Sequence, residues 1–266
     1  MAKGRSQETV IEYRDVYKAF DVPVLSGVTL SIPQGEIVAI VGPSGTGKSV
    51  LLKTTIGLIV PDRGDVLVEG ESVYFGRREA LREVRKKVGY VFQNAALFDS
   101  MTVFENVAFG LRDGEAKEIG REEVVRRVVK ALEEVNLDPS VVLRKLPAEL
   151  SGGMRKRVGL ARAIVGEPDI LLYDEPVTGL DPVNTAAVDQ LITAIAARTG
   201  VTSLVVTHDV PGALGFCDRI ALLEDGVLQF VGSPAEFRSS PNPLVQAFAD
   251  REAAAALARQ GLGAPA

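Results

Sequence analysis

The residues with the clearest chemical purpose form a glycine-rich run whose types and spacing suit phosphate binding. The run reads Gly42, Pro43, Ser44, Gly45, Thr46, Gly47, Lys48, Ser49. It follows an apolar stretch that ends at Val41, and a segment of helical pattern begins at Val50. Glycines let backbone N–H groups converge on a phosphate, and the positive end of a following helix adds to the attraction. The pattern predicts a P-loop in which Lys48 reaches the β- and γ-phosphates and the Ser49 hydroxyl binds Mg²⁺.

Two adjacent carboxylates follow a second apolar run of the sequence. The run covers residues 170–173, and Asp174 and Glu175 come directly after it. A strand that ends in a carboxylate suits a Walker B site, where Asp174 holds Mg²⁺ through water and Glu175 acts as general base for the attacking water. Because such strand ends are common, the interpretation as a Walker B site depends on the presence of the P-loop in the same chain. The sequence has no Asn-Lys-x-Asp motif to read guanine, which argues against a GTPase.

A third motif supplies a second place where an anion can bind. It reads Leu150, Ser151, Gly152, Gly153, Met154 and leads into a basic helical segment. A hydroxyl and two glycines at a helix N-terminus form an anion cradle. Since the chain already carries a P-loop, the second cradle implies a partner chain that presents it to the γ-phosphate in trans. The basic residues Arg155 to Arg157 are interpreted as a solvated helix face, with nucleic-acid binding as a remote alternative.

This third motif resembles the signature motif of ATP-binding-cassette (ABC) ATPases, which usually reads Leu-Ser-Gly-Gly-Gln. The resemblance covers about residues 9–235, with the motifs in the expected order. It implies that Gln93 is the Q-loop glutamine, which senses Mg²⁺ and the attacking water, and that Asp181 lies in the D-loop at a dimer interface. Met154 in place of Gln, and Gly179 in the D-loop, depart from the usual pattern.

The same resemblance implies roles for a histidine and an aromatic residue. His208 follows the apolar run 204–207, beside Asp209, and matches the switch histidine that contacts the γ-phosphate. Phe20 matches the aromatic residue that stacks on adenine, with Tyr17 as the competing aromatic. Because stacking tolerates any base, the preference for ATP over GTP rests on the resemblance.

The expected site residues fall into three groups by role. The catalytic group is Lys48, Gln93, Glu175 and His208. The groups expected at Mg²⁺ are Ser49, Gln93 and, through water, Asp174. The residues expected to bind ATP are Phe20, Gly42, Pro43, Ser44, Gly45, Thr46, Gly47, Lys48, Ser49, Val50, Gln93, Ser151, Gly152, Gly153, Asp174 and Asp181.

The elements that must position these residues are visible as short apolar runs separated by helical patterns. The runs cover residues 37–41, 88–92, 170–173, 203–207 and 220–223. Continuous apolarity is typical of strands that are covered on both faces, so the pattern predicts a parallel, doubly wound α/β sheet. Residues 9–35 and 64–75 instead alternate between turn signals, which predicts a small antiparallel β layer.

The segment between the Q-loop and the basic helix is predicted to be α-helical. Residues 122–137 repeat apolar side chains at helical spacing, which predicts one core-facing side made of Val124, Val125, Val128, Val129, Leu132 and Val135. A second apolar cluster, which serves either as a docking groove for a permease helix or as core, contains Leu97, Phe98, Met101, Val103, Phe104 and Val107.

The resemblance implies the α/β fold of a P-loop NTPase of the ABC ATPase type. Its domain is expected to cover residues 9–240, with a RecA-like, mostly parallel core at about 9–93 and 159–240. An α-helical subdomain is inserted at about 94–158. The tail, 241–266, is expected to begin as a helix and then to become disordered.

Composition excludes several classes of protein. The chain has 266 residues, 46% hydrophobic and 24% charged, which is ordinary for a globular protein. A net charge of −5 gives no support to nucleic-acid binding. Its one cysteine, Cys217, excludes an internal disulfide, and its one histidine excludes a His-rich metal site. The longest apolar run, Ala253 to Ala258, is far short of the ~20 residues of a membrane-spanning helix, and no secretory signal begins the sequence.

Residues outside the catalytic motifs indicate a subfamily. The runs 42–50, 93–107, 150–157, 208–211 and 243–248 resemble the ATPase subunit of Mce/Mla-type lipid transporters. The resemblance implies a homodimer around two ATP·Mg²⁺ that powers a separate integral-membrane permease and so moves phospholipids or other lipids across the cell envelope. It also implies a cytoplasmic chain bound to the inner membrane through the permease, with an Mce-domain lipid-binding protein as a partner and a small regulatory subunit left open.

Three alternatives stay open or are disfavoured by the sequence. The ATPase of another ABC importer, for an amino acid, a metal ion or another small solute, has the same catalytic residues. A non-transport ABC protein that acts on DNA or ribosomes usually has long coiled-coil insertions or two cassettes, whereas this chain has one signature motif. A simple P-loop kinase would not need that motif.

Overall fold

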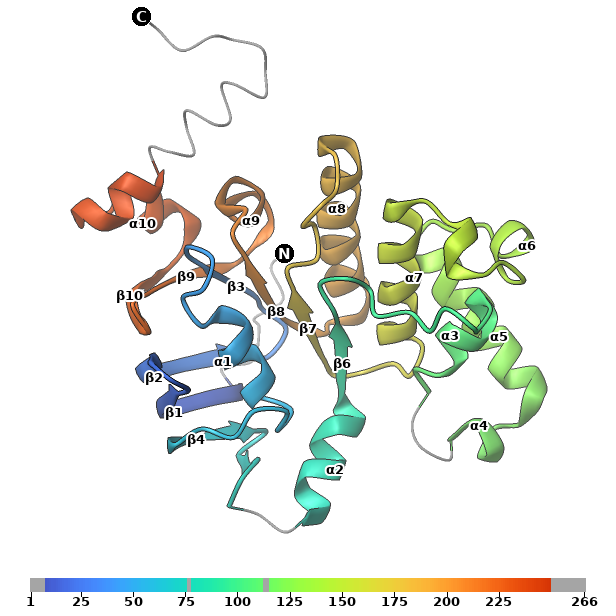
Figure 1. The fold of residues 1–266 in the computed structure, drawn as a ribbon, viewed down its shortest axis with the longest axis horizontal. Helices are drawn as coiled ribbons and strands as arrows, with labels where there is room; N and C mark the ends of the chain where they lie inside the picture. Colours follow the sequence, from blue (N-terminus) through green and yellow to red (C-terminus); the bar gives the residue numbers. More distant parts are fainter. Residues whose placement is uncertain (1–7, 76–77, 112–114, 250–266) are drawn as a thin grey trace, which may run out of the picture. The chain divides into compact units, whose positions relative to one another are not determined.

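The computed structural model describes residues 8–75, 78–111 and 115–249, which form two compact units (Figure 1). The first unit contains residues 1–81 and 204–266, and the second contains residues 82–203. The predicted division into a core and a helical subdomain uses other boundaries and stays a prediction. Residues 243–249 are helical, and the expected disorder of the tail falls beyond the described residues. Among those residues, every helix is too short or too polar to cross a bilayer.

An antiparallel sheet forms one part of the first unit, as the alternating segments predict. Its strands, in spatial order, are β2 (Pro23–Pro33), β1 (Thr9–Ala19), β4 (Arg63–Val68) and β5 (Glu71–Ser72). Tyr13 of β1 pairs with Leu30 on one side and with Val66 on the other. All three residues are buried, so this register directs one face of the sheet into the core.

The rest of the first unit is built on strands of which all but the half-buried β10 are mostly buried on both faces. They are β3 (Ile37–Val41), most of β8 (Thr202–Thr207), β9 (Arg219–Glu224) and β10 (Val227–Gly232). β3 lies parallel to β9, whereas β10 returns antiparallel to β9 through a tight turn at Asp225 and Gly226. Its helices are α1 (Lys48–Thr54), α9 (Val210–Phe216) and α10 (Pro234–Arg238). The predicted parallel arrangement therefore holds for β3 and β9.

The second unit combines two parallel strands with most of the helices. β6 (Val88–Val91) pairs in parallel with β7 (Ile170–Asp174), with Val88 opposite Ile170. The helices are α3 (Val103–Ala108), α4 (Glu115–Glu118), α5 (Gly120–Glu134), α6 (Pro139–Val142), α7 (Gly152–Ile164) and α8 (Pro182–Thr199). A further helix, α2 (Arg78–Lys87), leads into β6. α7 packs against α3, α5 and β6 and is the central helix of this unit.

Helix α5 confirms most of the predicted apolar side. Val124, Val128 and Leu132 are buried, and so is Val135 just after the helix. Val125, however, is exposed, because the buried stripe is narrower than the prediction and position 125 lies about 100° around the helix from position 124.

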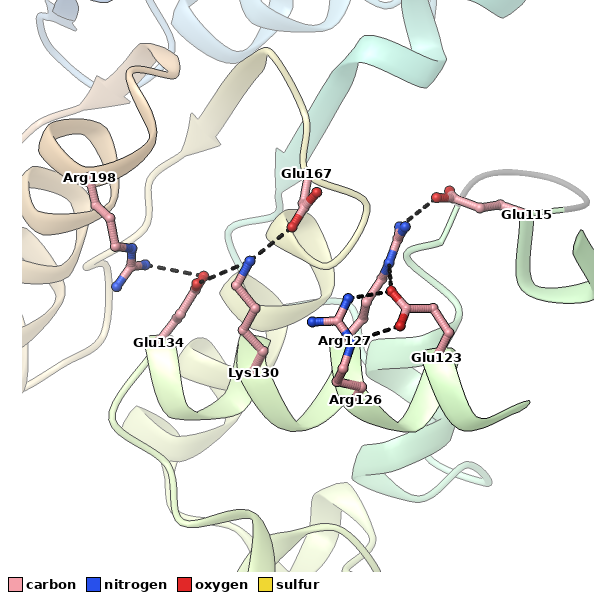
Figure 2. Close-up of polar contacts among 8 residues, drawn as sticks. All are labelled: Glu115, Glu123, Arg126, Arg127, Lys130, Glu134, Glu167 and Arg198. Carbon is pink, nitrogen blue, oxygen red and sulfur yellow. Dashed lines mark hydrogen bonds and ion pairs between the residues drawn. The ribbon is translucent and has the colours of Figure 1, made fainter. Parts of the chain in front are cut away.

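Charged side chains link α5 to three neighbouring segments of the same unit (Figure 2). The N–O pairs are Arg127–Glu115 at 2.6 Å, Arg127–Glu123 at 2.9 Å, Arg126–Glu123 at 2.5 Å, Lys130–Glu167 at 2.9 Å and Arg198–Glu134 at 3.1 Å. The guanidinium groups of Arg126 and then Arg127 lower the pKa of Glu123 to about 2. Because all of these pairs are at least partly exposed, each adds little stability, but together they fix where α5 meets α4, the loop after α7, and the end of α8.

Candidate active site

The loop between β3 and α1 has the shape that the glycine-rich run predicts. A Cβ at Gly42 would lie 2.1 Å from the carbonyl oxygen of Leu223, and one at Gly47 would lie 2.8 Å from that of Val24. Both glycines also have positive φ angles, of +150° and +96°. Only glycine permits this path at these two positions, so the motif residues are required by the backbone itself.

The donors of this loop are arranged for an anion. The Lys48 side chain is buried, and its ammonium donates to the carbonyl oxygens of Gly42 at 2.8 Å and Pro43 at 2.7 Å. Within the described part of the chain, the backbone N–H groups of residues 44–47 donate to no protein acceptor. A cleft of about 470 Å³ lies between this loop and the β9–β10 turn. Converging N–H groups beside a lysine, open to a cleft, can bind phosphate oxygens.

The structure separates the two aromatic candidates for adenine stacking. Tyr17 is half-buried in β1, packs against Gly27, and lies 4.7 Å from the Arg63 guanidinium. Phe20 lies beyond the end of β1, is 61% exposed, and has the Lys18 ammonium 5.3 Å from its ring centroid. The geometry therefore favours Phe20, whose ring face is accessible to a base.

His208 stands where β8 ends and α9 begins. Its side chain is exposed. The next residue, Asp209, receives the N–H of Gly212 at 3.4 Å and donates its own N–H to the Thr207 hydroxyl at 3.0 Å. This short turn fixes the backbone around His208 at the carboxyl end of a strand, where open α/β sheets bind their ligands.

In the second unit, both carboxylates at the end of β7 are held by hydroxyl groups. The Tyr90 hydroxyl donates to Oδ2 of Asp174 at 2.9 Å, and the Thr178 hydroxyl donates to Oε2 of Glu175 at 2.9 Å. Both carboxylates are buried. Neither Tyr90 nor Thr178 is among the site residues expected from the sequence. Tyr90 lies on β6, which pairs in parallel with β7, and its hydroxyl reaches Asp174 across this strand pair, a contact that spacing in the sequence does not reveal.

The signature residues begin α7. Ser151 caps the helix by accepting the N–H of Met154 at 3.3 Å, and Ser151 and Gly152 are both exposed. A Cβ at Gly153 would lie 2.6 Å from the Asn184 side chain, so only glycine fits between α7 and the start of α8. The motif therefore presents an exposed helix N-terminus, with a hydroxyl and an open glycine, on the surface of its unit.

The Asp181 carboxylate forms hydrogen bonds with residues that follow it directly in the sequence. Its carboxylate caps α8 by accepting the N–H groups of Val183 at 3.0 Å and Asn184 at 3.1 Å, and it also accepts the Asn184 side-chain amide at 2.5 Å. These bonds, with the side-chain amide first, lower the pKa of Asp181. Its carboxylate is therefore held ionised at the start of α8, and its contact with a partner copy stays a prediction.

The basic segment of α7 follows its predicted solvated face only in part. Arg155 is exposed, as the prediction requires, whereas Arg157 is half-buried and donates to the carbonyl oxygen of Asn136 at 3.0 Å. Lys156 is half-buried, and its ammonium donates to the backbone carbonyls of Gln93 and Glu175. The interpretation of Lys156 as solvated is thus wrong, because helical spacing alone does not reveal that backbone carbonyls lie within reach of this side chain.

The expected residues are thus divided between the two units. The first holds Phe20, the 42–50 loop and His208, and the second holds Gln93, Ser151 to Gly153, Asp174, Glu175 and Asp181. Comparison with known proteins bears on what this set does. Residues 25–178 match the sequence family described as ABC transporter. The chain belongs to this family.

Relatives extend the similarity over nearly the whole of this ABC chain. The intermembrane phospholipid transport system ATP-binding protein MlaF of Escherichia coli (strain K12) is 38% identical over 247 residues, covering 92% of this chain and 90% of MlaF. The probable ribonucleotide transport ATP-binding protein mkl of Mycobacterium leprae (strain TN) is 42% identical over 240 residues, covering 90% and 68%. The chloroplastic protein trigalactosyldiacylglycerol 3 of Arabidopsis thaliana is 40% identical over 274 residues, covering 94% and 77%.

Solved structures share the fold. A dimeric ATP-binding cassette in a post-hydrolysis state, bound to ADP and Pi, aligns with a TM-score of 0.75 and 32% identity, covering 84% of this chain and 98% of that one. The cbiO1 protein of Clostridium perfringens, described as part of the ABC transporter complex cbiONQ, aligns with a TM-score of 0.78 and 26% identity, covering 95% and 96%. The predicted P-loop ABC ATPase fold is confirmed, and this ABC protein is an ATP-binding, ATP-hydrolysing enzyme.

Proposed function

We propose that this chain is the ATPase subunit of an ABC transporter that moves phospholipids or other lipids across the cell envelope. The observation that carries the proposal is the similarity over 92% of the chain to an ATP-binding protein of an intermembrane phospholipid transport system. The Arabidopsis relative also bears the name of a lipid. The mycobacterial relative is named for ribonucleotide transport, which keeps another small solute as the second candidate.

In the proposed reaction, the chain's own residues bind ATP and activate water. Phe20 stacks on adenine, and the 42–50 loop with Lys48 binds the phosphates. Glu175 takes a proton from the attacking water, while Gln93 and His208 contact the water and the γ-phosphate. The Thr178 hydroxyl, 2.9 Å from Oε2, orients Glu175 for this role.

The residues proposed at Mg²⁺ fit its chemistry. Mg²⁺ prefers oxygen ligands and retains several waters, and Ser49, Gln93 and Asp174 all offer side-chain oxygens. Asp174 is buried at the end of β7, and the Tyr90 hydroxyl donates to its Oδ2. A bound Mg²⁺ would neutralise charge on the β- and γ-phosphates.

We further propose that two copies enclose two ATP molecules. The exposed Ser151 and Gly152, with Gly153 and Asp181, would contact the nucleotide held by the partner copy. ATP then joins the copies, and hydrolysis of the γ-phosphate releases them, which gives the chain two states that bound nucleotide selects. A related cassette that is dimeric with ADP and Pi supports this arrangement.

We also propose that the motion reaches an integral-membrane permease and holds the chain at the cytoplasmic face of the inner membrane. In the second unit, a groove of about 680 Å³ is lined by Phe92, Phe98 and Phe109 and by Arg82, Arg85 and Lys86. The rings of Phe98 and Phe109 pack edge to face, with their centroids 4.8 Å apart. A lining that combines aromatic and basic side chains suits a cytoplasmic helix of the permease that carries apolar and acidic side chains. An Mce-domain protein, and a small regulatory subunit, would complete the complex.

The enzymatic part of the proposal is tested with Glu175→Gln. Loss of a general base is expected to lower kcat by about 100-fold or more while ATP binding persists, so an ATP-bound dimer should accumulate. Turnover, nucleotide affinity and size-exclusion mass are measured with Glu122→Gln, an exposed carboxylate of α5, as the matched control. Brisk hydrolysis by Glu175→Gln would refute the general-base role.

The transport part is tested on the complex purified from its native membranes. The expected result is co-purification of a permease and an Mce-domain protein, with phospholipid identified by mass spectrometry and ATP-dependent lipid exchange between vesicles. Recovery of an amino-acid-type or metal-type binding protein, with no lipid exchange, would overturn the lipid assignment and favour the second candidate.

A further inference from the structure

Helix α7 binds the backbone of the segment that follows β6 through three positions spaced three residues apart. Lys156, Gly159 and Arg162 lie along one ridge of the helix. Lys156 donates to the carbonyl oxygen of Gln93, and Arg162 donates to those of Ala95 at 2.5 Å and Ala96 at 2.7 Å. These contacts give residues 93–96 a support that is independent of the strands.

The supported segment needs this help because of its backbone conformation. Ala95 and Ala96 have φ angles of +59° and +46°, in the left-handed region that residues with a Cβ rarely adopt. Between the two cations, a Cβ on Gly159 would lie 3.0 Å from Cβ of Ala95, so helix and segment are in close contact. The contacts from α7 therefore stabilise residues 93–96 in this conformation.

The Lys156 ammonium also reaches a second backbone group. It lies 3.5 Å from the carbonyl oxygen of Glu175, at the end of β7, so one ammonium bridges Gln93 and Glu175. Glu175 itself has a φ of +50°, and its carbonyl also accepts the N–H of Thr178 at 3.3 Å. Burial lowers the pKa of Lys156, and the charge of Glu175 acts against that by raising it.

We propose that Lys156 is a positioning residue that holds the backbones of Gln93 and Glu175 in register for ATP hydrolysis. The proposal rests on the proposed function, in which Glu175 is the general base and Gln93 contacts the attacking water. Lys156 touches neither nucleotide nor water in this role and acts only through those two residues. Since Ser151 caps α7, the same helix whose N-terminus is proposed to face the partner copy sets the geometry of the chain's own catalytic groups.

If Lys156 only stabilised the fold, its substitution would have a different effect from the substitution of a positioning residue. Misplacing catalytic groups lowers kcat and leaves ATP binding intact, because the P-loop is not affected. A general loss of stability would instead lower the melting temperature and the active fraction together. Lys156→Met keeps the side chain's length and apolar stem but removes its charge and donors, and Lys156→Arg restores both.

The helix offers a matched control in Arg157. Its guanidinium donates to the carbonyl oxygen of Asn136 at 3.0 Å, so Arg157→Met also removes one cation-to-carbonyl bond from α7. That bond lies away from Gln93 and Glu175. Arg157→Met should therefore keep kcat within about two-fold of the natural chain.

The experiment measures steady-state ATP turnover, ATP affinity and melting temperature for the full-length chain and its variants. Lys156→Met is expected to lower kcat about ten-fold with KM changed less than about three-fold, and Lys156→Arg to recover most of the loss. A kcat for Lys156→Met within about two-fold of the natural chain would overturn the proposal. So would an equal loss in Arg157→Met, or a parallel loss of ATP affinity.

Two further variants keep the outcome decisive. If Lys156→Met does not fold, Lys156→Gln, which retains an N–H donor without the charge, is judged by the same criteria. Glu175→Gln is assayed beside them. If that variant still hydrolyses ATP briskly, the general-base role on which this inference rests fails; if it is inactive while Lys156→Met is fully active, only the role of Lys156 fails.

Discussion

Glu175 illustrates how much of the candidate site is determined by the surroundings of a single residue. Its left-handed backbone costs a residue with a Cβ about 1–2 kcal/mol. Thr178 compensates twice, since its N–H binds the Glu175 carbonyl at 3.3 Å and its hydroxyl binds the carboxylate at 2.9 Å. The strained conformation and the bonds that hold it fix the direction of the carboxylate before any nucleotide binds.

The single cysteine gives a prediction at the same scale. Cys217 is 9% exposed, and burial, followed by the charge of Asp218, raises the pKa of its thiol to about 12. Because the thiolate is the reactive form, alkylation at pH 8 should be about 1,000-fold slower in the native chain than in urea. Mass spectrometry of a timed iodoacetamide reaction measures both rates, with free cysteine as the control. Equal rates would contradict the buried, protonated thiol.

Residue identities predicted the motifs well, but not the groups that hold them. Glycines 42 and 47 could be recognised because the backbone permits no other residue there. Lys156 and Tyr90 could not, since their roles depend on which carbonyl or carboxylate lies across a helix or a strand pair. Phe20 was separated from Tyr17 only by its exposure. Residues close together in the sequence identify the catalytic motifs, whereas the residues that hold those motifs in place are identified only by tertiary contacts.

At the scale of elements, the strands were the most predictable part of the fold. Residues 37–41 are β3, with every side chain buried, because continuous apolarity is what a strand covered on both faces needs. Helix α5 was predicted with one position in error, Val125, since an apolar residue beside a buried stripe is not itself required to be buried. The pairs of Figure 2 that join α5 to other segments, such as Lys130–Glu167 and Arg198–Glu134, were not predicted, because their partners are distant in sequence.

The groove in the second unit carries a prediction about partner binding. The predicted apolar cluster divides, with Val103 and Val107 in the core and Phe98 40% exposed and lining the groove. Phe98→Asp should therefore weaken binding to the permease at least about ten-fold while basal ATP turnover of the free chain persists, since the aspartate puts a charge among the aromatic side chains of the groove.

The matched control for this prediction is Phe75→Asp. Phe75 is 78% exposed and does not line the groove. Co-purification from membranes and permease-stimulated turnover are compared for the two variants. If Phe98→Asp still co-purifies at the natural level, the permease docks elsewhere and Phe98 serves the local packing with Phe109 alone.

At the scale of the whole molecule, the exposed signature motif is the reason to expect a second copy. The chain carries one P-loop and one signature motif, and Ser151 and Gly152 are exposed at the start of α7. In a two-fold symmetric dimer, each copy presents its signature motif to the partner's P-loop and receives the partner's signature motif at its own P-loop. Two equivalent sites therefore form together. A defect in the signature of one copy then disables the site that contains the partner's P-loop.

Complementation between two defective chains tests this arrangement. Ser151→Arg places a bulky cation where the partner's γ-phosphate would bind, and it should lower ATP turnover about 100-fold although its own P-loop is intact. Lys48→Ala should be comparably inactive through its P-loop. In the mixed dimer, one site combines an intact P-loop with an intact signature motif, and the other carries both defects.

Mixing the two variants should therefore restore activity that neither shows alone. With random exchange and independent sites, about one quarter of the natural turnover is expected, because half of the dimers are mixed and each has one intact site. Subunit exchange is verified with two affinity tags. The one-quarter value applies to the whole mixture, and the purified doubly tagged dimer, with one of its two sites intact, should show about one half of the natural turnover. Variants that exchange fully yet regain no activity would mean either that the signature acts within its own chain or that hydrolysis needs both sites intact.

A tandem dimer with both substitutions in the same half separates these two outcomes. If each site lies within one chain, the unsubstituted half keeps one intact site and the tandem dimer is active. If the sites are shared between the halves, both sites carry a defect and the tandem dimer should be inactive.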